Sequence, residues 1–391
     1  MNKMNSLLTI VATIHFSFLI LSTDKYGILI DSSGIAKKDF TYNKGKNITL
    51  NGKKIFALTA FHESNFVLLG TKKYEYFLSK HMSFSSEERS ALTLVQNKTL
   101  SSEWYSQDVV TFKKETITSL RCAKASLAAV ALKSIEDRHS RVLIYQLHEK
   151  TDIKGENINF LNQIITITES PNIITDFVFN IQEDSLACMR DDYSSLILQD
   201  IPNKKSQTFS DRSLEVIYAY AAVSLGWRKN GKELVSGGAL TCGKTSGKNI
   251  LYDYQLGNCR QVKEIKNSTD IKPDYLKVSK KDEVIFTEKG SQKIGFYNPI
   301  TQIITIIPAP AREAIMYMEF NPVYDLIAIA DVKGNFGIWD IKKESYIKGK
   351  SLNTFSITAL TWFNKGSELI IARQAEPNSP DMLEQIIVIQ K

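Results

Sequence analysis

The chain has 391 residues, 43% of them hydrophobic, which is enough apolar sequence to bury a sizeable core. Its formal net charge of +7 permits an acidic protein, RNA or a membrane surface as a partner but requires none of them. Downstream of the N-terminal segment, no stretch is apolar and long enough to span a bilayer, which excludes a bundle of transmembrane helices.

The N-terminal segment has two interpretations. Lys3 is followed by the apolar run LLTIVATIHFSFLIL, as in a secretory signal peptide. However, Phe18–Ile30 aligns without a gap to Phe66–Leu78, and a cleaved segment has no reason to resemble an internal repeat. His15 also interrupts the apolar run. We therefore expect this segment to belong to the fold, with entry into the secretory pathway as the alternative.

Throughout the chain, apolar runs alternate with turns rich in Gly, Asn, Asp and Lys, which is typical of short strands. The pattern restarts at intervals of about 41 to 62 residues, a suitable length for four-stranded units. The clearest units are Val223–Gly238, Ala314–Asp340 and Ile357–Gln374. The expected starts lie near Leu7, Ile55, Ile117, Ile173, Tyr218, Pro273, Ala314 and Ser356.

The unit Ala314–Asp340 resembles a WD repeat. A strand is followed by an Asn-Pro turn, a second strand, a turn at Asp331 and a third strand that ends in Trp339-Asp340. The resemblance covers nearly the whole chain but is divergent, because this is the only Trp-Asp pair and no Gly-His dipeptide is present. It implies an all-β protein: a single closed β-propeller spanning residues 1–391, with about seven or alternatively eight four-stranded blades.

Two regions depart from the repeat. Residues 82–108 are Ser-rich and polar, and they predict an insertion, either a long loop or an extra outer strand. The last unit ends on a strand at Gln385–Gln390 with no fourth strand after it. Because propellers protect such an edge by borrowing a strand from the other end of the chain, we expect an N-terminal strand to complete the last blade.

One segment matches a phosphate-binding motif. Gly238, Gly243, Lys244 and Thr245 satisfy G-x-x-x-x-G-K-[ST], in which backbone N–H groups and the lysine hold phosphates. Such a loop is followed directly by a helix, whereas here the run ILYDYQ indicates a strand. We interpret the segment as a loop between two strands and a possible surface site for an anion.

Other motifs give no catalytic or metal site. The histidines His62 and His148 each precede a glutamate but lack the second histidine of a zinc protease, since Phe66 and Asp152 occupy that position. The cysteines have no C-x-x-C spacing and indicate reduced thiols in a cytoplasmic or nuclear protein. We predict no catalytic residue, metal or cofactor. The cysteines are Cys122, Cys188, Cys242 and Cys259.

The resemblance implies a non-enzymatic scaffold that mediates protein–protein interactions within a multiprotein complex. The basic charge offers an alternative, a propeller that binds RNA or acidic phosphoinositides in ribosome assembly or membrane trafficking. A third hypothesis is nucleotide binding at residues 238–245.

Overall fold

The structure is a computed structural model, and it describes most of the chain from Ile28 to Gln390. The described ranges are 28–30, 36–49, 54–61, 63, 66–78, 84–98, 103–123, 125–136, 139–151, 157–169, 174–190, 196–209, 220–240, 249–255, 261–269, 271–279, 281–308, 314–331, 333–341, 345–348, 356–374 and 381–390. The expected start near Leu7 and the apolar N-terminal run lie outside these residues.

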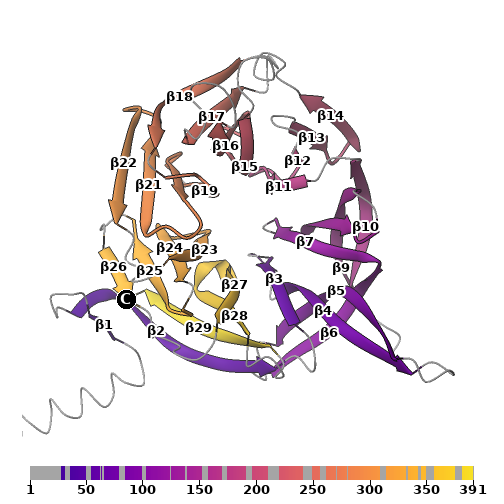
Figure 1. The fold of residues 1–391 in the computed structure, drawn as a ribbon. Helices are drawn as coiled ribbons and strands as arrows, with labels where there is room; N and C mark the ends of the chain where they lie inside the picture. The colour runs from indigo at the N-terminus through magenta and orange to yellow at the C-terminus, as the bar shows by residue number, and fades with distance from the viewer. Residues whose placement is uncertain are drawn as a thin grey trace, which may run out of the picture.

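The described strands form six four-stranded sheets and one five-stranded sheet, arranged around a common axis (Figure 1). Each four-stranded sheet is a meander of consecutive antiparallel strands, and its first strand lies innermost in the ring (Figure 1). This arrangement is a β-propeller, as the sequence predicted.

The six four-stranded sheets follow one another along the chain. The first sheet contains β3 (Lys54–Ala60), β4 (Phe66–Leu78), β5 (Phe84–Lys98) and β6 (Glu103–Lys113). The second contains β7 (Glu115–Cys122), β8 (Leu127–Ser134), β9 (Ser140–Thr151) and β10 (Asn157–Glu169). The third contains β11 (Ile174–Phe179), β12 (Ser185–Arg190), β13 (Leu196–Asp200) and β14 (Lys205–Phe209).

The fourth contains β15 (Tyr220–Trp227), β16 (Glu233–Leu240), β17 (Asn249–Gln255) and β18 (Gln261–Thr269). The fifth contains β19 (Tyr275–Val278), β20 (Val284–Thr287), β21 (Lys293–Asn298) and β22 (Ile303–Pro308). The sixth contains β23 (Ile315–Phe320), β24 (Leu326–Asp331), β25 (Phe336–Asp340) and β26 (Ser345–Lys348).

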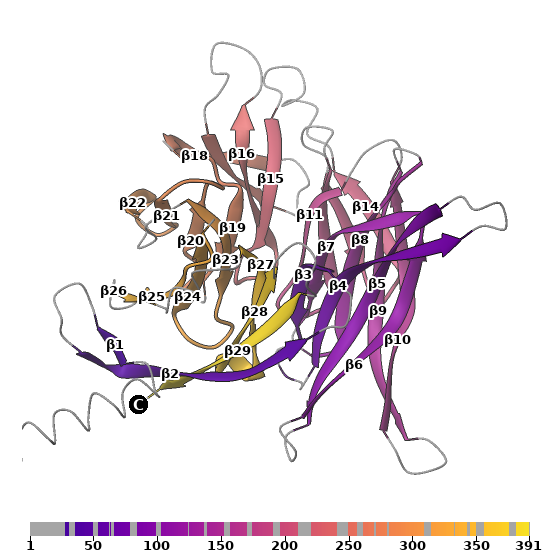
Figure 2. The ribbon, with the colours of Figure 1, turned by 60° about the horizontal axis from the view of Figure 1, so that its bottom comes forward.

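The five-stranded sheet joins the two ends of the chain. It consists of β27 (Ser356–Phe363), β28 (Glu368–Gln374), β29 (Met382–Gln390), β2 (Ala36–Thr49) and β1 (Ile28–Ile30), with the short 3-10 helix η1 (Asn364–Gly366) in the β27–β28 turn. Strand β2 runs antiparallel to β29, with Thr41 opposite Ile389, and both views show the two strands side by side (Figures 1 and 2). The predicted N-terminal strand therefore does complete the last sheet, which covers the edge of β29.

The starts of the inner strands agree with the sequence-based expectation. Strands β3, β7, β11, β15, β19, β23 and β27 each begin within two residues of an expected start. These starts are set by local sequence, because each inner strand consists mainly of apolar and β-branched residues.

The prediction of an insertion at residues 82–108 is wrong. Strands β5 and β6 are the third and fourth strands of their sheet, and β4 pairs along its whole length with β5, from Phe66 opposite Gln96 to Leu78 opposite Phe84. The inner half of β5 is core, since Leu92 and Val95 are fully buried. The first half of β5 is polar, and this composition misled the prediction. It is nevertheless part of the strand, because it pairs with the second half of β4.

The core lies between neighbouring sheets. Strands β8, β24 and β28 bury nearly every residue, because each sheet packs on a neighbour at both faces. One cluster joins β24 and β25 to β27 and β28 through Leu326, Ile338, Trp362 and Leu369. In the described part of the chain, no helix is long and apolar enough to cross a membrane.

Indole hydrogen bonds also join neighbouring inner strands. The Trp362 Nε1–H donates to the Glu319 carbonyl oxygen at 3.1 Å, from β27 to β23. The Trp227 Nε1–H donates to the Val178 carbonyl oxygen at 3.0 Å, from β15 to β11. The same contact thus recurs at two places in the ring and ties one sheet to the one before it.

Candidate functional site

The WD-like motif residues stabilise a turn and a sheet contact. Asp331 is buried, and its Oδ1 accepts hydrogen bonds from the backbone N–H groups of Lys333 and Asn335, each at 2.9 Å. Gly334 has φ +77°, a conformation that glycine adopts without the cost of a Cβ. Asp340 is buried at the end of β25, and Trp339 packs on the cluster between the fifth and sixth sheets.

The segment that matches the phosphate-binding motif is only partly described. Gly238 lies in β16, opposite Ile250 of β17, and is therefore part of a strand. Gly243, Lys244 and Thr245 lie outside the described residues. Strands β16 and β17 are antiparallel neighbours, whereas a nucleotide P-loop joins a strand to a helix within a parallel α/β arrangement.

The inner strands line a central channel, in which four charged side chains form two ion pairs. Arg121 of β7 lies 3.6 Å from Asp176 of β11, measured from Nη2 to Oδ1. Lys277 of β19 lies 3.4 Å from Glu319 of β23, measured from Nζ to Oε1. All four residues line a cavity of about 290 Å³ in the channel. Among the described residues, no group of three or more His, Cys, Asp or Glu could hold a metal ion.

Burial and mutual charge shift the pKa values of two members of this group. Burial raises the pKa of Asp176, while the cations of Arg121 and Lys277 and two backbone hydrogen bonds oppose the shift. Burial lowers the pKa of Lys277. The cation of Arg121 lowers this pKa further, whereas the carboxylate of Glu319 raises it. The four groups therefore act on one another across the channel.

The sequence analysis missed these four residues. Each lies in a different inner strand, and the strands are contributed by different sheets. A usable signal was present, since β11 and β23 each carry a single charged residue among apolar neighbours: Asp176 in ITDFVF and Glu319 in IMYMEF. A charge inside a short buried strand indicates that the side chain points to a polar channel or to a partner.

Two tyrosines also line the channel. The Tyr275 hydroxyl donates a hydrogen bond to the Met316 carbonyl oxygen at 2.6 Å, and burial raises the pKa of Tyr275 to about 12. Burial likewise raises the pKa of Tyr317.

We expect Tyr275 to ionise later than an exposed tyrosine. Its folded-state pKa is raised, so the neutral form stabilises the fold below about pH 10, and this contribution is lost as the pH rises towards 12. The Tyr275→Phe variant should lose a late step in the ultraviolet phenolate titration and should lose less stability between pH 9 and pH 11 than the wild type. Identical titration curves for the two proteins would contradict the expectation.

A second, larger cavity opens where the inner strands end. We call this cavity, lined among others by Arg121, Val178, Ile181, Trp227 and Lys277, the mouth. It has a volume of about 530 Å³, within the range of pockets that bind ligands.

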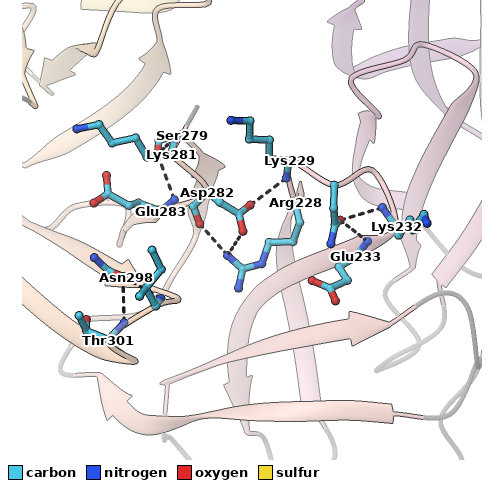
Figure 3. A network of polar contacts seen from close by, with 12 residues as sticks. Arg228, Lys229, Lys232, Glu233, Ser279, Lys281, Asp282, Glu283, Asn298 and Thr301 are labelled. Carbon is cyan, nitrogen blue, oxygen red and sulfur yellow. Dashed lines mark hydrogen bonds and ion pairs between the residues drawn. The ribbon is translucent and has the colours of Figure 1, made fainter.

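A polar network fixes two turns beside the mouth (Figure 3). The buried Arg228 guanidinium donates to the Asp282 carbonyl oxygen at 2.8 Å and lies 3.5 Å from its carboxylate. The Lys229 backbone N–H donates to Asp282 Oδ1 at 2.9 Å. The network joins the β15–β16 turn to the β19–β20 turn, and Figure 3 shows Asn298, the last residue of β21, and Thr301 of the β21–β22 turn in the same region.

Comparison with known proteins supports the fold and nothing finer. No family model matches the chain, and no curated protein matches it. Among solved structures, it is similar to a chain in a structure entitled "Crystal Structure of Mitotic Checkpoint Complex", with a TM-score of 0.59 and 12% sequence identity. The match covers 88% of this chain and 93% of that chain. The likeness extends over most of both chains and concerns the β-propeller fold.

Proposed function

We propose that this protein is a non-enzymatic, seven-bladed WD-like scaffold for protein–protein interactions within a multiprotein complex of the cytoplasm or nucleus. Each described sheet is then one blade. A rigid ring of this kind offers two faces and a rim to several partners at once. The similar solved chain comes from a structure whose title names a complex. The observation that carries the proposal is an uneven distribution of exposed apolar side chains.

Among the described residues, four of the six exposed large apolar side chains lie at one end of the ring. We call this end the lower face. It is formed by turns that follow the first and third strands of their sheets, at residues 180–184, 228–232, 279 with 281–283, 299–302 and 321–325. Ile181, Ile300 and Val323 lie on these turns, and Ile303 begins the next strand. Ile300 is 87% exposed. Apolar side chains that gather on one surface are typical of contact sites for other proteins.

The described lysines do not favour the nucleic-acid or lipid alternative. Lys229 and Lys281 lie on the lower face, whereas Lys289 and Lys333 lie on turns at the opposite end. A surface for RNA or acidic phosphoinositides requires cations gathered on one face. Lysines on turns at both ends of the ring are typical of solvent-exposed turns, where they keep the strand edges soluble.

We expect the tagged protein to elute in a large assembly from an extract of its own cells. The Ile300→Asp variant should move a large part of the protein to the elution volume of a single chain, because a charge replaces an exposed apolar contact. Size-exclusion chromatography with mass spectrometry of the co-eluting proteins measures this shift. The matched control is Ile135→Asp, since Ile135 is 57% exposed and lies at the opposite end of the ring.

Two results would contradict the scaffold proposal. The first is elution of the wild-type protein as a single chain. The second is an assembly that survives Ile300→Asp and is lost with Ile135→Asp, which would assign the contact to the opposite end of the ring.

A further inference from the structure

The mouth lies at the centre of the lower face, and its walls are mainly apolar. Val178, Phe179, Leu225 and Trp227 come from β11 and β15, two neighbouring inner strands. Ile181 lies on the β11–β12 turn at the rim and is 48% exposed. An apolar pocket of this volume, with its opening beside an exposed isoleucine, suits the insertion of a large apolar side chain.

The floor of the mouth presents more positive than negative charge. Arg121 and Lys277 both line it, and each is more exposed than its carboxylate partner: 35% against 14% for Arg121 and Asp176, and 26% against 19% for Lys277 and Glu319. Asp176 lines the deeper cavity and not the mouth. Arg121 is thus the member of its ion pair that lines the mouth, whereas both members of the Lys277–Glu319 pair line it.

The rim adds further charges of both signs. Lys229 is exposed on the β15–β16 turn, and its backbone is held in place by Asp282. Arg228 also lines the mouth but is paired with Asp282. Glu183 and Glu319 are the carboxylates that line the mouth, so its lining has four cationic and two anionic side chains. Asp176 and Asp282, which pair with Arg121 and Arg228, are not part of the lining. The lining itself therefore has an excess of positive charge, which favours a ligand with a carboxylate.

We propose that the mouth binds an extended segment of a partner protein in which a large apolar side chain lies next to an acidic one. The apolar side chain fills the pocket between β11 and β15, and the carboxylate lies near Arg121 and Lys277. Guanidinium groups bind carboxylates with two parallel hydrogen bonds, which gives such a contact directional specificity. The inference rests on the proposed scaffold function, because it names the chemistry of one partner.

The test selects short random peptides displayed on phage against the immobilised full-length chain. We expect enrichment of sequences that place Asp or Glu beside a large apolar residue. A synthetic peptide with the enriched sequence should lose tenfold or more in affinity for Ile181→Glu, which puts a carboxylate at the rim. Its affinity should fall several-fold for Lys229→Glu. Its affinity should also fall several-fold for Arg121→Lys, which keeps the positive charge but loses the planar guanidinium.

The controls separate binding from folding. Ile135→Asp, at the opposite end of the ring, should bind the peptide as the wild type does. Thermal unfolding of each variant shows whether the fold is retained, and Ile181 and Lys229 are exposed enough to be replaced without disturbing the core.

Three outcomes would overturn the inference: no enrichment, enriched peptides without an acidic residue, or equal affinity for Ile181→Glu and the wild type. Binding of polyuridylate or of phosphoinositide-containing vesicles that Ile181→Glu abolishes, without any enriched peptide, would overturn it in favour of a nucleic acid or a lipid. If the peptides fail while the assembly still depends on Ile300, the scaffold function stands and only this inference fails.

Discussion

Replacing Trp362 with alanine should lower the free energy of unfolding by about 3–5 kcal/mol, the usual cost of removing a large aromatic side chain from a core. Trp362 is the largest of the fully buried side chains among the described residues. It lies in β27 and packs on Leu326 and Ile338 of the preceding sheet. The variant therefore leaves a cavity at the contact between two sheets, where neither sheet can collapse freely because the ring holds both.

The substitution also removes a hydrogen bond. The Trp362 indole donates to the Glu319 carbonyl oxygen, and the same glutamate pairs through its side chain with Lys277 in the channel. Trp362→Phe keeps most of the apolar volume but loses the donor, so we expect a smaller loss of about 1–2 kcal/mol. Denaturant unfolding followed by circular dichroism measures both losses. Equal midpoints for Trp362→Ala and the wild type would show that this sheet contact does not stabilise the ring.

Replacing Asp381 with alanine should cost about 2–3 kcal/mol, because the change leaves a buried backbone N–H without an acceptor. Asp381 is 1% exposed and directly precedes β29. Its Oδ2 accepts a hydrogen bond from the Ile55 backbone N–H at 2.7 Å, and its Oδ1 lies 3.3 Å from Lys54 Nζ. The residue thus ties the last sheet of the ring to the first, in addition to the pairing of β2 with β29.

Two variants separate the backbone contact from the ion pair. Asp381→Asn keeps an acceptor oxygen and should lose less stability than Asp381→Ala. Lys54→Ala should lose less than about 1 kcal/mol, because the Lys54 side chain is 32% exposed and such pairs contribute little. Denaturant midpoints rank the three variants. A loss from Lys54→Ala as large as that from Asp381→Ala would mean that the ion pair, and not the Ile55 contact, carries the effect.

Short-range patterns predict much of this fold. Asn230 and Gly231 form a tight turn that is local in sequence: the Asn230 side chain accepts hydrogen bonds from the Lys232 and Glu233 backbone N–H groups, and Gly231 has φ +65°. The Asp331 turn is equally local. The polar start of β5 was misread, because pairing with β4 and not composition decides whether that segment is a strand.

The sequence by itself determined the all-β repeat, the starts of the inner strands and the strand borrowed to close the ring, because turn chemistry and apolar runs act over a few residues. Only the tertiary structure decided which distant residues meet. The charges of Arg121, Asp176, Lys277 and Glu319 come together because their four inner strands surround one axis. Asp381 likewise reaches Ile55 only in the closed ring, since no local pattern relates the two ends of the chain.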